Sequence, residues 1–168
     1  RELALLWLAD RVEESLTAPA LPKRIDVVTA LHACDTATDD AIRFALAKDA
    51  RHVVLVPCCQ AEVAAALRAG KSEALSRTPL AELWRHPIHT RELGSHLTNV
   101  LRCLLLEAHG YSITVTELVG WEHSLKNELI IATRVNAPRR DARSRLQQIL
   151  QELNLQELEG RFLGPQSP

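Results

Sequence analysis

One stretch, residues 26–39, constrains the fold more than any other part of the chain, because it changes abruptly from apolar to polar. Its first half, up to Leu31, is a near-continuous apolar run of strand length, and its second half contains His32, Cys34 and Asp35. Runs of this kind are typical of strands that are buried on both faces, as in parallel sheets. Polar groups just past such a strand lie at its carboxyl end, where open α/β sheets bind ligands. The stretch therefore predicts an α/β fold with a site at that edge.

A second stretch repeats the arrangement. Residues 53–56 are apolar, and Pro57, Cys58, Cys59 and Gln60 follow them directly. If the two strands are parallel neighbours, both sets of polar residues converge on one edge of the sheet. We therefore expect Cys34 to lie at the same edge as Cys58 or Cys59.

The apolar periodicity along the chain predicts alternating helices and strands, followed by two strands joined by a loop. Helices are expected over 2–16, 39–48, 61–69, 90–109 and 141–153, and strands over 25–31, 52–56, 111–119 and 128–135. Thr38 or Asp39 is expected to cap the second helix, and the long helix from Thr90 is expected to pack through a stripe that includes Val100. We expect one domain over 1–155 and a flexible tail over 156–168.

Composition excludes several classes of protein. The chain has 168 residues and a net charge of -1, so no overall basic field points to nucleic acid. It has no apolar run near the roughly 20 residues that a membrane helix needs. Four cysteines, two of them adjacent, do not form a disulfide framework in a chain of this length. These features predict a soluble protein of the reducing cytoplasm with no membrane partner.

Three motifs carry a resemblance to a known family. They are LHACDTATD at 31–39, PCCQ at 57–60 and EHSLKN at 122–127. They resemble motifs of a class I S-adenosylmethionine-dependent methyltransferase-like family, whose last motif usually has Thr and Pro where this chain has Ser124 and Leu125. The resemblance covers residues 24–135. It implies a Rossmann-like methyltransferase sheet, here its second half, with two parallel strands, a final antiparallel pair and flanking helices.

The resemblance also implies S-adenosylmethionine as cofactor, but part of the expected site is absent from the sequence. The family's glycine-rich loop cradles the methionine part of the cofactor, and no Gly-x-Gly occurs among the six glycines of this chain. The chain also begins at Arg1 and contains no methionine. We therefore expect the missing half to precede Arg1 and to cover the strand at 25–31, which would otherwise be an exposed apolar edge. A homo-oligomer could cover the same edge.

The resemblance assigns roles to the first motif. His32, Cys34 and Asp35 are candidate catalytic residues, because they occupy the position that meets the cofactor's sulfonium end and orients the acceptor. Methyl transfer is an in-line displacement, so alignment supplies much of its rate, and His32 could take a proton if the acceptor needs a base. The backbone from Leu31 through His32 to Ala33 is the candidate cofactor contact. The structural alternative is that Asp35 and Thr36 only cap the following helix.

The other two motifs supply candidate substrate-binding residues, which are Pro57, Cys58, Cys59, His123, Lys126 and Asn127. Lys126 could meet a carboxylate or phosphate, and Asn127 could fix a base edge or a backbone group. The structural alternative for the last motif is a solvated turn. The acceptor is not specified, and RNA or protein is suggested by family analogy alone.

Metal binding is the main rival for the Cys/His cluster. His32, Cys34, Cys58 and Cys59 have the right donor types for tetrahedral zinc, but the side chains of adjacent cysteines tend to diverge. We therefore expect no stoichiometric metal, and no change of melting temperature with a chelator. A non-catalytic domain that uses this cluster for a metal or a partner remains the alternative function.

Two further groups have weaker functional interpretations. His86 and His89 flank a proline in a loop, and the arginines at 134, 139, 140, 143 and 145 form a basic run. The run could contact RNA phosphates, but a solvated helix face is the simpler interpretation.

Overall fold

The computed structural model describes residues 15, 18, 21–34, 36–58, 60–70, 79–120, 127–137 and 139–163. The helix expected over 2–16 lies almost wholly outside this range. The elements in chain order are β1 (Val27–Leu31), α2 (Thr36–Ala47), β2 (His52–Val56), α3 (Glu62–Gly70), η1 (Pro79–Trp84), α5 (Pro87–Ala108), β3 (Tyr111–Glu117), β4 (Glu128–Arg134), α6 (Ala142–Glu152), η2 (Gln156–Leu158) and α7 (Glu159–Phe162). All four expected strands are present.

The strands form one open sheet in the order β1-β2-β4-β3. β1 and β2 are parallel and in register from Val27↔His52 to Leu31↔Val56. β4 runs antiparallel to both β2 and β3, so the last strand of the chain lies between them. This confirms the expected partial Rossmann-like methyltransferase fold, with two parallel strands followed by an antiparallel pair.

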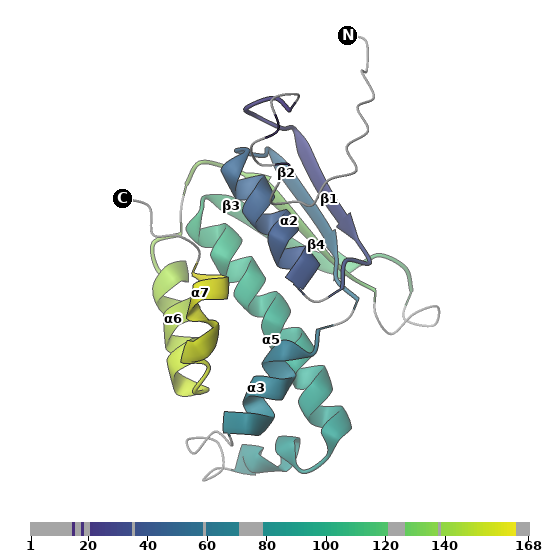
Figure 1. The fold of residues 1–168 in the computed structure, drawn as a ribbon, viewed down its shortest axis with the longest axis vertical. Coiled ribbons are helices and arrows are strands. Elements are labelled where there is room, and N and C mark those ends of the chain that lie inside the picture. The colour runs from purple at the N-terminus through teal and green to yellow at the C-terminus, as the bar shows by residue number, and fades with distance from the viewer. Residues whose placement is uncertain are drawn as a thin grey trace.

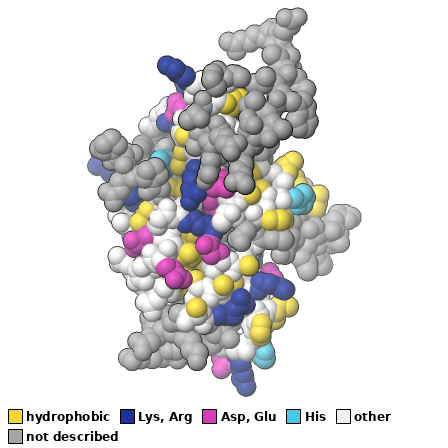
Figure 2. Space-filling model, viewed as in Figure 1, with side chains coloured by type: hydrophobic (Ala, Val, Ile, Leu, Met, Phe, Trp, Pro, Cys, Tyr) yellow, Lys and Arg dark blue, Asp and Glu magenta, His cyan; other side chains and the backbone are white. Residues whose placement is uncertain are grey.

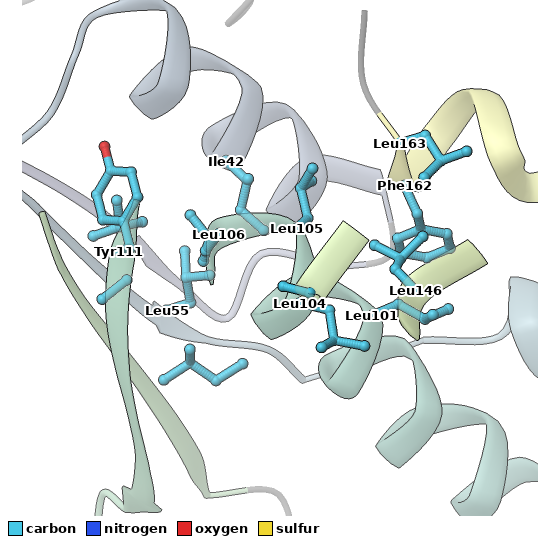
Figure 3. Packing of buried hydrophobic residues seen from close by; sticks show 14 of the residues in the cluster. Ile42, Leu55, Leu101, Leu104, Leu105, Leu106, Tyr111, Leu146, Phe162 and Leu163 are labelled. Carbon is cyan, nitrogen blue, oxygen red and sulfur yellow. The ribbon is translucent and has the colours of Figure 1, made fainter. Parts of the chain in front are cut away.

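The core lies between one face of this sheet and the helices (Figure 1). In Figure 3, Leu55 and Tyr111 from the sheet lie with Ile42 of α2 and Leu106 of α5 in one cluster. Tyr111 is anchored at its polar end, because its hydroxyl donates to the carbonyl of Ala50 at 2.6 Å. The crossover helix α2 and the long helix α5 therefore hold the parallel pair from the same side.

β1 differs from the expected strand that is buried on both faces. Val28 and Ala30 point into the core, whereas Val27 is 49% exposed and Leu31 is 62% exposed. The reason is that β1 is an outer strand of the sheet, and the core helices pack against the face that bears Val28 and Ala30. An apolar groove of about 330 Å³ runs beside it, and its lining includes Ile25 and Val27.

Three local expectations need correction. α2 begins at Thr36, so Thr38 and Asp39 lie inside its first turn and are buried instead of capping it. α5 begins earlier than expected, at Pro87, because proline suits the first turn of a helix, where its missing N–H costs nothing. Val100 is 46% exposed and lies outside the packed stripe of α5.

The tail expected over 156–168 is structured as far as Leu163. η2 and α7 pack against α6 and α5, and Phe162 is completely buried (Figure 3). Leu158 and Leu163 also belong to the core. Apolar side chains at a short helical spacing thus outweigh the local glycine and proline content that suggested a tail.

Candidate functional site

The carboxyl ends of β1 and β2 meet at one edge of the sheet. The register pairs their last residues, Leu31 and Val56, and the backbone N–H of His32 donates to the carbonyl of Val56 at 3.0 Å. Because β4 is antiparallel to β2, its first residue, Glu128, lies at this edge too. The edge therefore brings together the first two motifs and Asn127, the last residue of the third motif.

Two thiols meet at this edge, as the sequence predicts. The Sγ atoms of Cys34 and Cys58 are 3.3 Å apart, a hydrogen-bond contact in which either can donate. Cys34 is exposed and Cys58 is half-buried. The Cys34 thiol also lies 3.8 Å from the carbonyl oxygen of His32. The geometric prediction from the two motifs is confirmed for this pair.

His32 has a backbone conformation that most residues avoid. Its φ is 52°, in the left-handed region, and its side chain is exposed. Non-glycine residues at positive φ are uncommon, although His tolerates the region better than most. Glycine would relieve the backbone there.

Asn127 is nine-tenths buried, and it forms hydrogen bonds with residues that follow β3. Its Nδ2 donates to the carbonyl of Val119 at 2.5 Å, and its backbone carbonyl accepts from the N–H of Leu118 at 2.8 Å. These bonds close the loop that precedes β4. Asn127 thus has a structural task at this edge, and its expected contact with substrate stays a prediction.

The other candidates divide into described and undescribed residues. Leu31 is exposed, Ala33 is half-buried and Pro57 is buried at the end of β2. Asp35, Cys59, His123 and Lys126 lie outside the described residues, so their roles stay predictions. His86 and His89 are both exposed, with ring centroids 5.3 Å apart.

A buried ionic cluster lies beneath the first motif, and the sequence interpretation missed it. Both carboxylate oxygens of Asp39 accept from Arg102, at 2.7 Å from Nε and 2.9 Å from Nη2. Arg161 of α7 also donates to Asp39 and pairs with Glu62 of α3. Arg102 is completely buried. An arginine inside the apolar run at 101–106 was the signal that could have revealed it.

The same cluster reaches the second motif through Gln60, which is buried. Its side chain lies 2.9 Å from Asn99 Oδ1 on α5. In the orientation that satisfies both amide atoms, Gln60 donates to the carbonyl of Ser95 at 2.8 Å and accepts from Arg102 Nη1 at 3.1 Å. Asp39 of the first motif and Gln60 of the second are therefore fixed by one guanidinium. Arg102 thus links the helical end of the first motif to the second motif without lying at the edge itself.

Cys103 lies on α5, away from the two thiols at the edge. Burial raises its pKa to about 12, with smaller contributions in the same direction from Glu128 and Glu107 and an opposing one from Arg102. This thiol stays protonated at neutral pH. Cys103 is partly buried and packs against the core cluster.

Most arginines of the basic run have partners within the protein. Arg134 pairs with Asp49 at 2.5 Å, and Arg139 pairs with Glu107 and Asp141. On the face that Figure 2 shows, basic side chains are interspersed with acidic ones. This mixture does not form the continuous basic stripe that phosphate backbones select.

Among the described residues, no group of three or more His, Cys, Asp or Glu side chains is placed to hold a metal ion. Of the cysteines in the candidate zinc-ligand set, Cys34 and Cys58 lie in contact with each other, and Cys59 lies outside the described residues. Within the same described part of the chain, no helix combines the length and apolar character needed to cross a membrane.

The sheet topology and its motif-bearing edge are consistent with a methyltransferase-like α/β fold. More particularly, residues 6–66 match the family model described as a methyltransferase domain. The match spans β1, α2 and β2, and so includes both cysteine motifs. It supports methyltransferase activity in general terms. No curated protein and no solved structure gives a significant match to the chain.

Proposed function

We propose that this domain carries out methyl transfer from S-adenosylmethionine, with the edge formed by the first two motifs as the place where cofactor and acceptor meet. The observation that carries the proposal is the contact between Cys34 and Cys58, since it brings the two motif loops together at the carboxyl ends of parallel strands.

The described residues fit one side of such a cofactor site. The backbone from Leu31, which is exposed, to Ala33, which is half-buried, would line the cofactor, and the exposed His32 could receive a proton from the acceptor. The cofactor supplies the electrophilic methyl group, and the protein supplies alignment and exclusion of water. The acceptor is proposed to lie over Pro57, Cys58 and Cys59.

The glycine-rich half of the site is proposed to come from a segment outside these 168 residues, because the chain has no Gly-x-Gly. Isothermal titration of S-adenosylmethionine should then show weak or no binding to the 168 residues, and binding to the full-length protein. Tight binding by the 168 residues alone would show that the cofactor site is misplaced.

His32→Gly sharpens the test, because it removes the imidazole while relieving the positive φ. In the full-length protein we expect unchanged or slightly higher stability but at least tenfold weaker cofactor binding or methyl transfer. His52→Ala is the matched control, since His52 begins β2 at the opposite end of the sheet. Equal effects of the two variants would contradict the placement of the site.

The missing glycine loop also favours a second candidate, a domain of this fold without catalytic activity. The same titration separates the two, because that domain would not bind the cofactor in the full-length protein either.

A further inference from the structure

The two thiols at the sheet edge have a chemistry of their own. Cys34 and Cys58 lie on separate loops that follow paired strands, 24 residues apart in sequence, with their sulfur atoms at 3.3 Å. A disulfide requires about 2.05 Å between sulfur atoms, so the pair must close by only roughly 1.3 Å. Both loops are short continuations of strands in fixed register. The pair is therefore close to the geometry of a crosslink.

Accessibility points the same way. Cys34 is exposed, so a small oxidant reaches its sulfur directly, and Cys58 is only half-buried beside it. Cys103, the other described thiol, lies on α5 against the core and stays protonated. An exposed thiol next to a second thiol is a frequent arrangement among redox-sensitive cysteines.

We propose that Cys34 and Cys58 form a reversible disulfide when the protein meets hydrogen peroxide. The Cys34 thiol gives up its proton, and the thiolate attacks one peroxide oxygen. The O–O bond breaks, the leaving hydroxide takes up that proton to become water, and a sulfenic acid remains on Cys34. The Cys58 thiol then attacks the sulfenic sulfur, the S–S bond forms, and a second water leaves. Two thiols are thus oxidised by two electrons, and one hydrogen peroxide is reduced to two waters. A dithiol reductant returns both thiols.

The inference goes beyond the proposed function, because the crosslink is measured on the protein without cofactor or acceptor. It holds or fails whether or not the domain transfers methyl groups. Its consequence for the site is direct, since the bond would join the first motif to the second.

The test uses peptide mapping of the 168-residue protein after treatment with one equivalent of hydrogen peroxide and blocking of remaining thiols. Trypsin should release Cys34 in the peptide 25–43, and Cys58 together with Cys59 in the peptide 52–68. We expect these two peptides to be linked, with the loss of two hydrogen atoms, and to separate on addition of dithiothreitol.

Variants resolve which thiols react. The link should persist in Cys59→Ser and Cys103→Ser, and it should disappear in Cys34→Ser and Cys58→Ser. Circular dichroism confirms that each variant is folded, and the Cys59→Ser protein alone decides the matter if another variant does not fold. Absence of the 25–43 to 52–68 link in Cys59→Ser overturns the proposal. A link found only in covalent dimers on a non-reducing gel overturns it as well.

Discussion

Replacing Asp39 by Asn tests the ionic cluster beneath the first motif. The substitution keeps the shape of the side chain but removes the negative charge that accepts two hydrogen bonds from the completely buried Arg102. Buried ion pairs are weak evidence for stability as a whole, yet removal of one partner typically costs about 3–5 kcal/mol. The amide oxygen can still accept from one guanidinium, so we expect the lower part of this range, about 3 kcal/mol.

The measurement is urea unfolding followed by circular dichroism. With a slope near 2 kcal/mol per molar urea, a loss of about 3 kcal/mol lowers the midpoint by about 1.5 M. Asp40→Asn is the matched control, because Asp40 is the next residue of α2 and pairs with Arg43 at 3.0 Å in a partly exposed position. Exposed pairs contribute about 0–1 kcal/mol. A loss below about 1 kcal/mol for Asp39→Asn, or equal losses for both variants, would refute the reasoning.

Three further predictions concern packing and the buried thiol. Gly94→Ala should cost about 1–3 kcal/mol in urea unfolding, because its Cβ would come within 2.6 Å of α3, whereas Gly160→Ala has open space and should be neutral or stabilising. Phe162→Ala should lower the free energy of unfolding by about 3–5 kcal/mol, because Phe162 is completely buried. An unchanged free energy of unfolding would support the flexible tail that the sequence predicts. Iodoacetamide at neutral pH should label Cys34 well before Cys103, whose pKa rises from 9.0 to about 12 on folding. Between these two pH values the unfolded protein loses the Cys103 proton and the folded protein keeps it, so the free energy of unfolding should fall as pH rises through this interval. The Cys103→Ser variant should lack this fall.

The sheet could be predicted from the sequence because its strands have continuous apolar runs or an alternation of apolar and polar residues. β2 agrees with the prediction at both ends, and the contact of Cys34 with Cys58 follows from parallel strands in register. The antiparallel ending was also predictable, because β3 and β4 are separated by a short connection.

The ionic cluster could not be predicted in the same way. Asp39 looked like a helix cap, because an acidic residue near the start of a helix usually faces solvent and the exposed N–H groups. Its actual partners, Arg102 and Arg161, lie on elements whose approach to α2 depends on the packing of the whole core. α7 was missed because a helix of four residues leaves no periodic pattern. The arginine inside the apolar run at 101–106 signals a buried charge, but the partners that neutralise it are fixed by tertiary structure.

The spacing of the Asp39 cluster along the chain has a consequence for biosynthesis. Asp39 leaves the ribosome first, its bidentate partner follows 63 residues later, and Arg161 follows after 122 residues. Until Arg102 emerges, the acidic side chain has neither cation, so burying it would leave an uncompensated charge. α2 can therefore be helical early, but its final docking waits for α5. The last part of the described chain to be synthesised, α7, then completes the charge balance at the motif that was synthesised near the beginning.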